Sequence, residues 1–263
     1  MSVRPRQKSN IKKRESTIQV RKKSALLSTP TRASSVARTE DFSEARKQVV
    51  ISILTGRRPM LLMKTLRSLV QRAPLLAAEA HVVVLVNGND EPTRSVLKNI
   101  SWVNEVHHTD TLLPIGEGFS TLMRLALGQG QRYVLHLEDD WECCNEEDSW
   151  FHKAVHTIEK YGVGQVRLRN AKDMVMPVNA LSQQKIKWEK FGDSLSIAKN
   201  AHFTFNPSLV PAVVMQGLHP CESETDAMHK YAVTQLPVAQ LVPGAFLHIG
   251  GGDQSLADKT GGR

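Results

Sequence analysis

The sequence predicts a three-layer α/β domain with a mostly parallel central sheet, preceded by a disordered basic tail. From Gln48 onward, short apolar segments alternate with amphipathic ones, which is the pattern of strands alternating with helices. The segment His81–Val86 (HVVVLV) is apolar after its first residue, as expected for a parallel strand covered by helices on both faces. The positive charge is concentrated in residues 1–47, which sets them apart from the domain.

The basic tail accounts for all of the net charge of +8. Residues 1–47 hold 13 Lys and Arg against 4 Asp and Glu, a balance of +9, whereas the remaining chain holds 21 against 22, a balance of −1. The tail is rich in Ser and poor in aromatics, and it lacks a sustained hydrophobic period, so we expect disorder. It acts either as a solubilising leader or as an arm for a polyanion such as nucleic acid. An anionic membrane fits less well, because the tail has almost no apolar anchor.

Composition excludes several classes of protein. No stretch approaches the roughly 20 apolar residues that cross a bilayer, and the N-terminus lacks the apolar core of a secretory signal. Cys143 and Cys144 are adjacent and only Cys221 lies elsewhere, which suits neither a disulfide framework nor a zinc site. We therefore expect a cytoplasmic protein without a transmembrane segment.

Hydrophobic spacing places the elements of the domain. The first strand is Gln48–Leu54, and Pro59 suits the first turn of a helix that runs to about Arg72. The same reasoning predicts strand His81–Val86, a short helix Pro92–Asn99, a weak strand Val103–Thr109, a helix from near Phe119 to Gly128 or Gly130, strand Tyr133–Leu137, a helix capped by Asp148, and strand Gly164–Asn170. Beyond residue 170 the pattern is less regular, and we expect short helices there.

Three carboxylates, Glu138, Asp139 and Asp140, follow directly on the apolar strand Tyr133–Leu137. Adjacent negative charges repel and are rarely buried unpaired. In open α/β sheets, however, ligands bind beyond the carboxyl ends of the strands. A divalent cation such as Mg²⁺ or Mn²⁺ would offset the repulsion there. The alternative is a solvated acidic loop that caps the next helix.

The order of these parts resembles the GT-A glycosyltransferases, especially the family 2-like group, over roughly residues 48–255. The segment VVISILTGRRPMLLMKTLRSL resembles the family's opening strand, substrate loop and helix. VVVLVNGND resembles its nucleotide-contacting turn, PIGEGFSTLMRLAL its Gly-rich segment, and YVLHLEDDWE its DxD motif. FTFNPSLV, ESETDAMHKYA and GAFLHIGGG resemble the acceptor segment, the base motif and a late metal-binding His. The resemblance implies a nucleotide-sugar-binding half (48–170) and an acceptor-binding half with the catalytic base (171–263).

The activity implied is displacement of a nucleoside diphosphate from a sugar by an acceptor hydroxyl. Mn²⁺ or Mg²⁺ would act as Lewis acid and template, with Asp140 and His248 as ligands; His248 is otherwise an ordinary core histidine. Glu138 and Asp139 would contact the ribose or sugar, or bind the metal through water. For the general base, Asp226 comes first and Glu224 second, in a helix expected to begin after Thr225. One base and in-line attack would invert the anomeric carbon, although retention stays open. The alternative role for Asp226 and Glu224 is helix capping.

The donor, implied to be a UDP-linked sugar, would meet the residues at the strand ends and around the Gly-rich segment. These are Thr55, Gly56, Arg57, Asn87, Asn89, Gly116, Gly118 and Arg124. Each has a simpler alternative: Arg57 or Arg58 as a surface charge, Gly116 and Gly118 as a helix-entry loop, and Arg124 as a solvent-facing residue. Asn87 and Asn89 stand where the family often has Asp, which leaves the base of the donor open. The Gln-x-x-Arg-Trp segment of processive members is absent, so single transfers are expected.

Other functions compete with this interpretation. A sugar nucleotidyltransferase needs a Gly-rich loop with Arg and Lys after the first strand, but TGRRPM has a single glycine. A non-catalytic nucleic-acid-binding protein would explain the tail, but not the carboxylates together with a candidate base. The basic tail and the absence of a membrane anchor favour a polyanionic acceptor, so a hydroxymethylated DNA base is our hypothesis for the acceptor. A glycan or other cell-surface polymer is the alternative.

Overall fold

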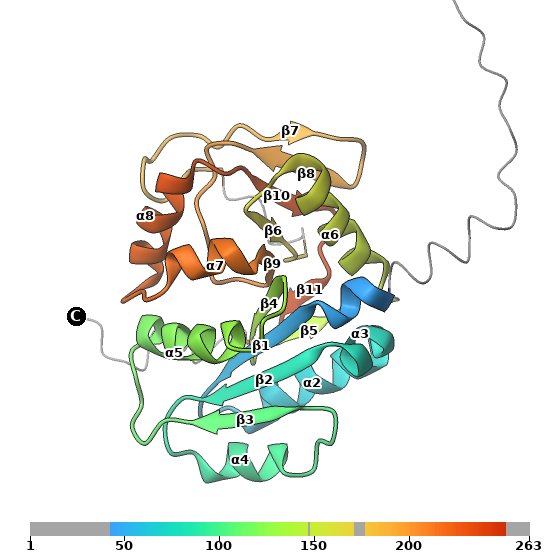
Figure 1. Cartoon of the computed structure of the whole chain (residues 1–263), viewed down its shortest axis with the longest axis vertical. Coiled ribbons are helices and arrows are strands. Elements are labelled where there is room, and N and C mark those ends of the chain that lie inside the picture. Colours follow the sequence, from blue (N-terminus) through green and yellow to red (C-terminus); the bar gives the residue numbers. More distant parts are fainter. Residues whose placement is uncertain (1–42, 147, 171–176, 251–263) are drawn as a thin grey trace, which may run out of the picture.

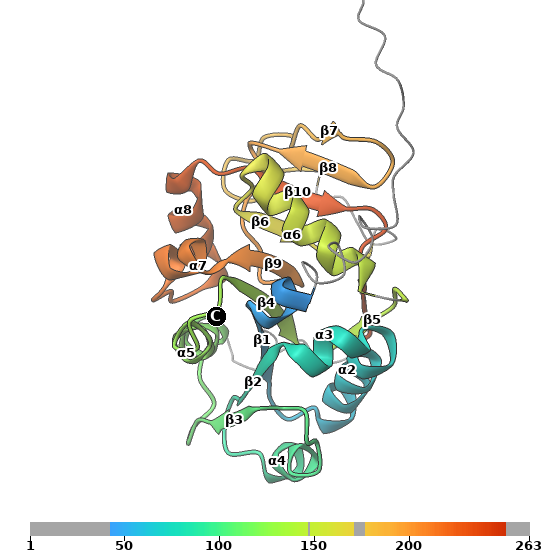
Figure 2. The same ribbon diagram turned by 45° about the vertical axis from the view of Figure 1, so that its right-hand side comes forward.

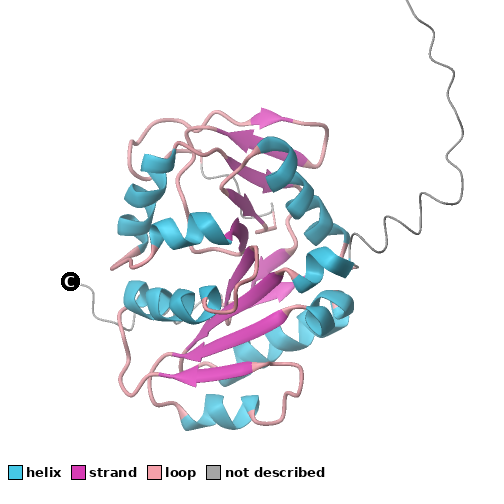
Figure 3. Ribbon diagram, viewed as in Figure 1, coloured by secondary structure: helices cyan, strands magenta, loops and turns pink. Residues whose placement is uncertain are grey.

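The structure is a computed structural model that describes residues 43–146, 148–170 and 177–250 (Figure 1). Over these residues the chain forms a nine-stranded sheet with helices on both faces (Figure 3). Across the sheet the strands are β3 (Glu105–His108), β2 (His81–Val86), β1 (Val49–Thr55), β4 (Tyr133–Glu138), β9 (Ser208–Pro211), β6 (Gln165–Arg167), β10 (Val238–Leu241), β8 (Leu195–Ala198) and β7 (Glu189–Lys190). The predicted three-layer α/β architecture with a mostly parallel sheet is confirmed.

The parallel half of the sheet is built on β1, which is buried along its whole length. Strands β2 and β4 flank it in parallel, with Ile51 opposite both Val82 and Leu135, and β3 continues the parallel order beyond β2. A strand with helices on both faces has no side exposed to water. This explains why β1 and β2 are continuous apolar runs in the sequence.

The second half of the chain extends the same sheet. Strand β9 pairs antiparallel with both β4 and β6, and β10 then pairs parallel with β6. Strands β8 and β7 close the far edge in antiparallel order. The segment beyond residue 170, which looks irregular in the sequence, therefore shares one sheet with the first half.

Helices cover the two faces of the sheet as separate layers (Figure 2). The helices are α2 (Pro59–Arg72), α3 (Pro74–Glu79), α4 (Glu91–Leu97), α5 (Ile115–Leu127), α6 (Ser149–Tyr161), α7 (Ala212–Leu218) and α8 (Glu224–Thr234). Ile51 and Ile53 of β1 belong to the core beneath α2, α3 and α6, whereas Val50 and Leu54 belong to the core beneath α5, α7 and α8. None of the described helices is long and apolar enough to pass through a bilayer.

A small two-stranded ribbon crosses the end of the large sheet. Strand β5 (Trp141–Cys143) pairs antiparallel with β11 (Phe246–His248), so that His248 lies opposite Trp141. Strand β5 follows the three carboxylates directly in the sequence. The ribbon therefore carries the late histidine to them from more than a hundred residues away.

Several element boundaries differ from the predicted ones. Helix α5 begins at Ile115, four residues before Phe119, so Gly116 and Gly118 lie in its first turn and not in an entry loop. Helix α8 begins at Glu224, because Ser223 caps it by accepting a hydrogen bond from the Asp226 amide at 3.0 Å. A later start, after Thr225, was wrong for this reason. The short helix α3 was not predicted, since six residues are too few to reveal a helical period.

The folded domain begins earlier than Gln48. Residues 43–47 form a helical turn, and the buried Arg46 side chain donates to Glu79 at 2.7 Å and lies 3.9 Å from Asp148. The last residues assigned to the basic tail thus belong to the domain. The rest of the predicted tail, residues 1–42, lies outside the described residues.

Gly116 marks a close approach of α5 to the segment before α8. A Cβ atom at this position would lie 2.1 Å from the carbonyl oxygen of Glu222, which is backbone and cannot rotate away. We therefore expect Gly116→Ala to lower the free energy of unfolding by about 1–3 kcal/mol, measured by urea denaturation. The matched control is Gly217→Ala in α7, where a Cβ meets nothing within 4 Å and a gain of about 0.5–1 kcal/mol is expected. Equal effects at the two glycines would contradict the predicted contact.

Candidate active site

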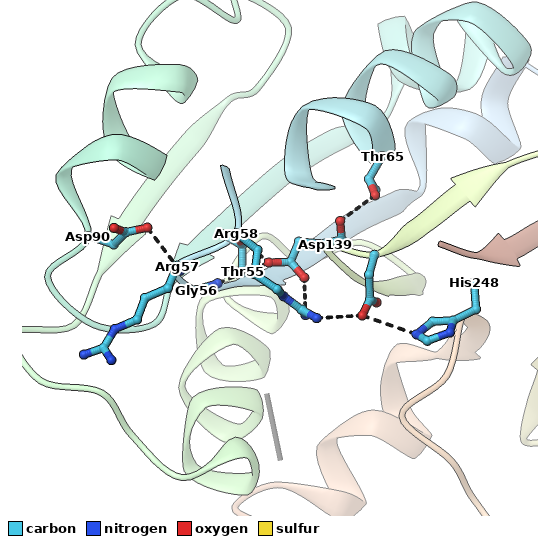
Figure 4. Close-up of polar contacts among 9 residues, drawn as sticks. Thr55, Gly56, Arg57, Arg58, Thr65, Asp90, Asp139 and His248 are labelled. Carbon is cyan, nitrogen blue, oxygen red and sulfur yellow. Dashed lines mark hydrogen bonds and ion pairs between the residues drawn. The ribbon is translucent and has the colours of Figure 1, made fainter. Parts of the chain in front are cut away.

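The candidate site lies where β1 and β4 end side by side. In the parallel register Leu54 stands opposite Glu138, so Thr55 and Gly56 meet Asp139 at the same edge of the sheet (Figure 4). The carboxyl ends of two adjacent parallel strands form the usual ligand-binding edge of an open α/β sheet. Thr55, Gly56 and Asp139, all assigned to the donor from the sequence, therefore lie together in the structure.

Asp139 is fully buried, and the chain binds each of its oxygens. Its Oδ2 accepts from Thr55 Oγ1 at 2.7 Å and from the Gly56 amide at 3.3 Å, and its Oδ1 accepts from Arg58 Nη2. Its backbone carbonyl accepts from Thr65 Oγ1 in α2 at 2.8 Å. Asp139 therefore joins the end of β1 to the first turns of α2.

Arg58 bridges the two aspartates. It is buried, and besides Asp139 it donates from Nη1 to Asp140 Oδ2 at 2.8 Å. The residue before it, Arg57, has a left-handed backbone (φ 58°), and its amide is held by Asp90 Oδ2 at 3.1 Å. A left-handed residue reverses the chain locally. The exposed Arg57 and the buried Arg58 therefore point in different directions at the start of α2 (Figure 4).

Asp140 and His248, which the family resemblance implies as ligands of one metal ion, lie next to each other. His248 Nε2 lies 3.3 Å from Asp140 Oδ2, and the Ile249 amide donates to the Asp140 carbonyl at 2.9 Å. Gly250 follows so closely that a Cβ there would lie 2.6 Å from Asp140 Oδ2. Asp140 Oδ1 is buried and has no hydrogen-bond partner among the described residues. The strand β11 and the residues after it thus close over this carboxylate.

The environment shifts the pKa values of Glu138 and Asp139 upward. Burial, and then the charges of Asp140 and Asp139, raise the pKa of Glu138 to about 8. Burial also raises the pKa of Asp139 to about 6, against the opposing effects of Arg58 and Thr55. For Arg58, burial alone would lower the pKa, but the two aspartates outweigh it and raise the value. Near neutral pH, Glu138 accordingly holds a proton and Arg58 holds its charge.

The raised pKa of Glu138 predicts a dependence of stability on pH. The folded state holds a proton that the unfolded chain releases above its ordinary pKa of 4.5, so stability falls as pH rises from 4.5 towards 8. Glu138→Gln removes this proton. Between about pH 5 and 8 we expect the variant's free energy of unfolding to fall less steeply than wild type, by up to about 1.4 kcal/mol per pH unit. If the free energy of unfolding, measured by urea denaturation, changed with pH by the same slope in both proteins, Glu138 would not be protonated in this range.

Of the two base candidates, Glu224 lies on the side of the carboxylates. Its charge contributes to the raised pKa of Glu138, and its Oε1 accepts from the Phe205 amide at 2.9 Å. Asp226 is committed to its own helix end: its Oδ2 accepts from Lys230 at 2.8 Å and from the Glu222 amide at 3.1 Å. These two donors, Lys230 first, lower the pKa of Asp226.

The residues predicted to line the donor pocket differ in whether their side chains are free to contact a ligand. The Asn87 side chain is buried and exchanges hydrogen bonds of 2.9 Å with the backbone of Leu113, whereas Asn89 is exposed. Gly116 and Gly118 bring α5 against its neighbours, and a Cβ at Gly118 would lie 3.1 Å from Asn87 Nδ2. Arg124 is exposed on α5, where its charge acts on His219. Nucleotide contacts by these residues stay predictions.

Comparison with known proteins identifies the architecture. No protein-family model and no curated protein sequence matches the chain, but solved structures do. Residues 1–349 of S. aureus TarS match with a TM-score of 0.50 at 15% identity, over 76% of this chain and 60% of that one. GalNAc-T7, solved with UDP, GalNAc and Mn²⁺, matches with a TM-score of 0.54 at 11% identity, over 76% of this chain and 43% of that one. Both are glycosyltransferases of the GT-A class.

The chain has the GT-A fold. Likeness at this level of identity concerns the fold, and the chain spans less than two thirds of the length of either match. The GT-A fold accounts for the parallel half of the sheet. It also explains why the second half continues the sheet and does not form a separate domain.

A divalent cation, which the GT-A fold implies, does not fit the site as it is arranged. No group of three or more His, Cys, Asp and Glu side chains in the described part of the chain is placed to hold a metal. Both oxygens of Asp139 are bonded, and Asp140 Oδ2 is shared by Arg58 and His248, which leaves Asp140 Oδ1. A cation bound there would lie close to the guanidinium that already pairs with both carboxylates. The expectation from the sequence that Asp140 and His248 bind Mn²⁺ or Mg²⁺ is therefore not carried into the proposed function.

One basic residue beside the site was missed by sequence reasoning. Arg169 lies over the Trp141 ring, with 5.6 Å from its guanidinium carbon to the ring centroid, and the His248 ring packs on the same tryptophan at 4.9 Å. The Arg169 Nε is buried and lacks a hydrogen-bond partner among the described residues. Nothing in the sequence around GQVRLRN distinguishes this arginine, because its neighbour Trp141 is 28 residues away in the chain.

Proposed function

We propose that the protein is a glycosyltransferase that moves a sugar from a nucleotide-sugar donor to a hydroxyl acceptor. The observation that carries the proposal is the cluster of Asp139, Asp140 and Arg58 at the joined ends of β1 and β4, with Glu224 near enough for its charge to act on Glu138. The GT-A fold supports it, as does the UDP bound in the structure of GalNAc-T7. A UDP-linked sugar is therefore the donor that we would test first.

For the donor, we infer that the nucleotide lies along the loop that begins at Thr55 and Gly56. The exposed Arg57 side chain borders this loop, and Asp90 fixes its backbone. Arg169 supplies positive charge on the Trp141 side, where a diphosphate leaving group would need it, and the His248 side chain, which is 38% exposed, lies on the same tryptophan. No step in this scheme passes through a metal ion.

For the acceptor step, Glu224 is the favoured base. It would take the proton of the acceptor hydroxyl while the hydroxyl oxygen attacks the anomeric carbon. The bond from that carbon to the diphosphate oxygen breaks, and its electrons leave with the nucleoside diphosphate. One base and an in-line attack invert the anomeric configuration. Asp226 is less suited, because its carboxylate already pairs with Lys230.

The identity of the acceptor rests on the sequence alone. A hydroxymethylated DNA base remains our hypothesis because of the basic balance of residues 1–47, most of which lie outside the described residues. A glycan or cell-surface acceptor remains the alternative, and the cytoplasmic location is likewise a prediction. Comparing the nucleosides of host DNA by mass spectrometry with and without the protein would test the DNA hypothesis. An unchanged nucleoside profile would contradict the DNA-acceptor hypothesis and would leave the proposal of a nucleotide-sugar donor unaffected.

The donor side is tested by incubating the protein with a panel of nucleotide sugars in the absence of an acceptor. A glycosyltransferase transfers the sugar slowly to water, so we expect release of a nucleoside diphosphate from one donor class. Asp140→Ala should lose this release while keeping its circular-dichroism spectrum, since the residue stands beyond the end of β4. Release of pyrophosphate from a nucleoside triphosphate and a sugar phosphate would instead identify a nucleotidyltransferase.

A further inference from the structure

The guanidinium of Arg58 is placed as a counter-ion of both aspartates. Two different nitrogens of one guanidinium bind two different carboxylates, Nη1 on Asp140 and Nη2 on Asp139. All three side chains are nearly inaccessible, with exposed fractions of 7% for Arg58, 5% for Asp140 and 0% for Asp139. Buried carboxylates require a counter-charge, and a planar guanidinium supplies it with fixed direction.

The surrounding backbone holds this guanidinium in place. Arg58 is the N-cap of α2, directly before Pro59, so its Cα is fixed by the start of a helix whose inner face is buried. The left-handed conformation of Arg57 and its bond to Asp90 set the turn that delivers Arg58 to the aspartates. A strained residue held by a specific partner indicates a position that the fold maintains. Chance contact of a flexible surface arginine does not explain this arrangement.

A divalent cation would have to compete with this pairing. A metal on Asp140 would either share the carboxylate with Arg58, at the cost of repulsion between like charges, or displace Arg58 from two buried partners. At an effective dielectric constant of about 20, repulsion by a single unit charge about 4 Å away weakens the binding of a cation by on the order of 10³-fold. The arginine therefore lowers the affinity of the site for any cation.

We propose that Arg58 takes the place of the divalent cation in this GT-A site, so that the donor is bound and used without a metal. In this role Arg58 is a positioning residue: it compensates the charge of Asp139 and Asp140 and fixes their orientation at the edge of the sheet. The part of the proposal that concerns donor use rests on the proposed glycosyltransferase function. The part that concerns the absence of a resident cation does not rest on that function, and it is tested by a separate measurement.

The first arm of the test measures binding of Mn²⁺ alone, by electron paramagnetic resonance of free Mn²⁺. The proteins are wild type, Arg58→Met and the control Arg67→Met, which changes an exposed arginine on the same helix. We expect no saturable binding below millimolar Mn²⁺ by wild type and by Arg67→Met, and at least about tenfold tighter binding by Arg58→Met. Saturable binding by wild type that is lost in Asp140→Asn would overturn the proposal, and this comparison needs no Arg58 variant to fold. Equal, weak binding by wild type and a folded Arg58→Met would overturn it as well.

The second arm measures diphosphate release from the donor that wild type uses, with EDTA or with added Mn²⁺. We expect wild type to keep its rate in EDTA, and Arg58→Lys, which keeps the charge but not the two-pronged contact, to be slower at any metal concentration. Loss of wild-type activity in EDTA with recovery in Mn²⁺ contradicts the proposal. If no donor is used at all, the proposed function fails, while the Mn²⁺-binding arm still decides whether Arg58 replaces the cation.

Discussion

Replacing Glu224 with Gln is expected to slow sugar transfer by about 10²–10⁴-fold, the range that a general base contributes. Glutamine keeps an oxygen acceptor for the Phe205 amide, so the start of α8 should keep its structure. What is lost is the ability to take the proton of the acceptor hydroxyl. Because the base acts after the donor is bound, kcat should fall while donor binding, measured by calorimetry, stays near the wild-type value.

Two further variants separate this role from simple charge removal near the helix end. Glu222→Gln changes an exposed carboxylate two residues away, and its rate should match wild type. Asp226→Asn removes the partner of Lys230 and is expected to weaken the helix start more than it slows transfer. If Asp226→Asn loses the activity and Glu224→Gln keeps it, the base is Asp226, as the sequence alone had favoured.

Replacing Arg58 with Met should cost about 3–5 kcal/mol in free energy of unfolding, because it leaves two buried carboxylates without their counter-charge. Methionine replaces the aliphatic part of the arginine side chain, so most of the loss is assigned to the missing charge and hydrogen bonds. Urea denaturation at pH 7 measures the effect. The loss should shrink at lower pH, where Asp139, whose pKa is raised by burial, takes up a proton in place of its pairing with the missing arginine.

The matched control for Arg58→Met is Arg67→Met, an exposed change on α2 that should alter stability by less than about 0.5 kcal/mol. Adding Asp139→Asn to Arg58→Met should restore part of the loss, since it removes one of the two unpaired charges. A double-mutant cycle of this kind gives the coupling between the two side chains. Coupling near zero would mean that the buried pair does not stabilise the fold.

The sequence predicted the parallel half of the fold well because its signals are local. The run His81–Val86 is buried on both faces and matches β2 at both ends, and Pro59 to Arg72 has the helical spacing of α2. The rule that ligands gather at strand ends brought Thr55 together with the acidic triplet, as observed. The ribbon that carries His248 to Asp140 agrees with the family resemblance, although its pairing was not predicted.

The remaining features depend on contacts between distant segments. Arg57 and Arg58 are neighbours of the same residue type, and only the left-handed backbone of Arg57 decides which of the two side chains turns inward. The Gly-x-Gly of α5 looked like a loop, whereas Gly116 serves the approach of a backbone more than a hundred residues away. The strands of the second half are two to four residues long, too short for a period, and their order is set by long-range pairing.

The central claim is that a nucleotide sugar binds at the joined ends of β1 and β4, over the Arg58–aspartate cluster. A crystal structure of the protein with the donor that it uses, grown in EDTA, tests this most directly. We predict the nucleotide along the Thr55–Arg57 loop, the diphosphate on the side of His248, and Arg58 still bound to Asp139 and Asp140. A donor bound elsewhere on the chain, or found at this edge only when a metal has displaced Arg58, would contradict the account.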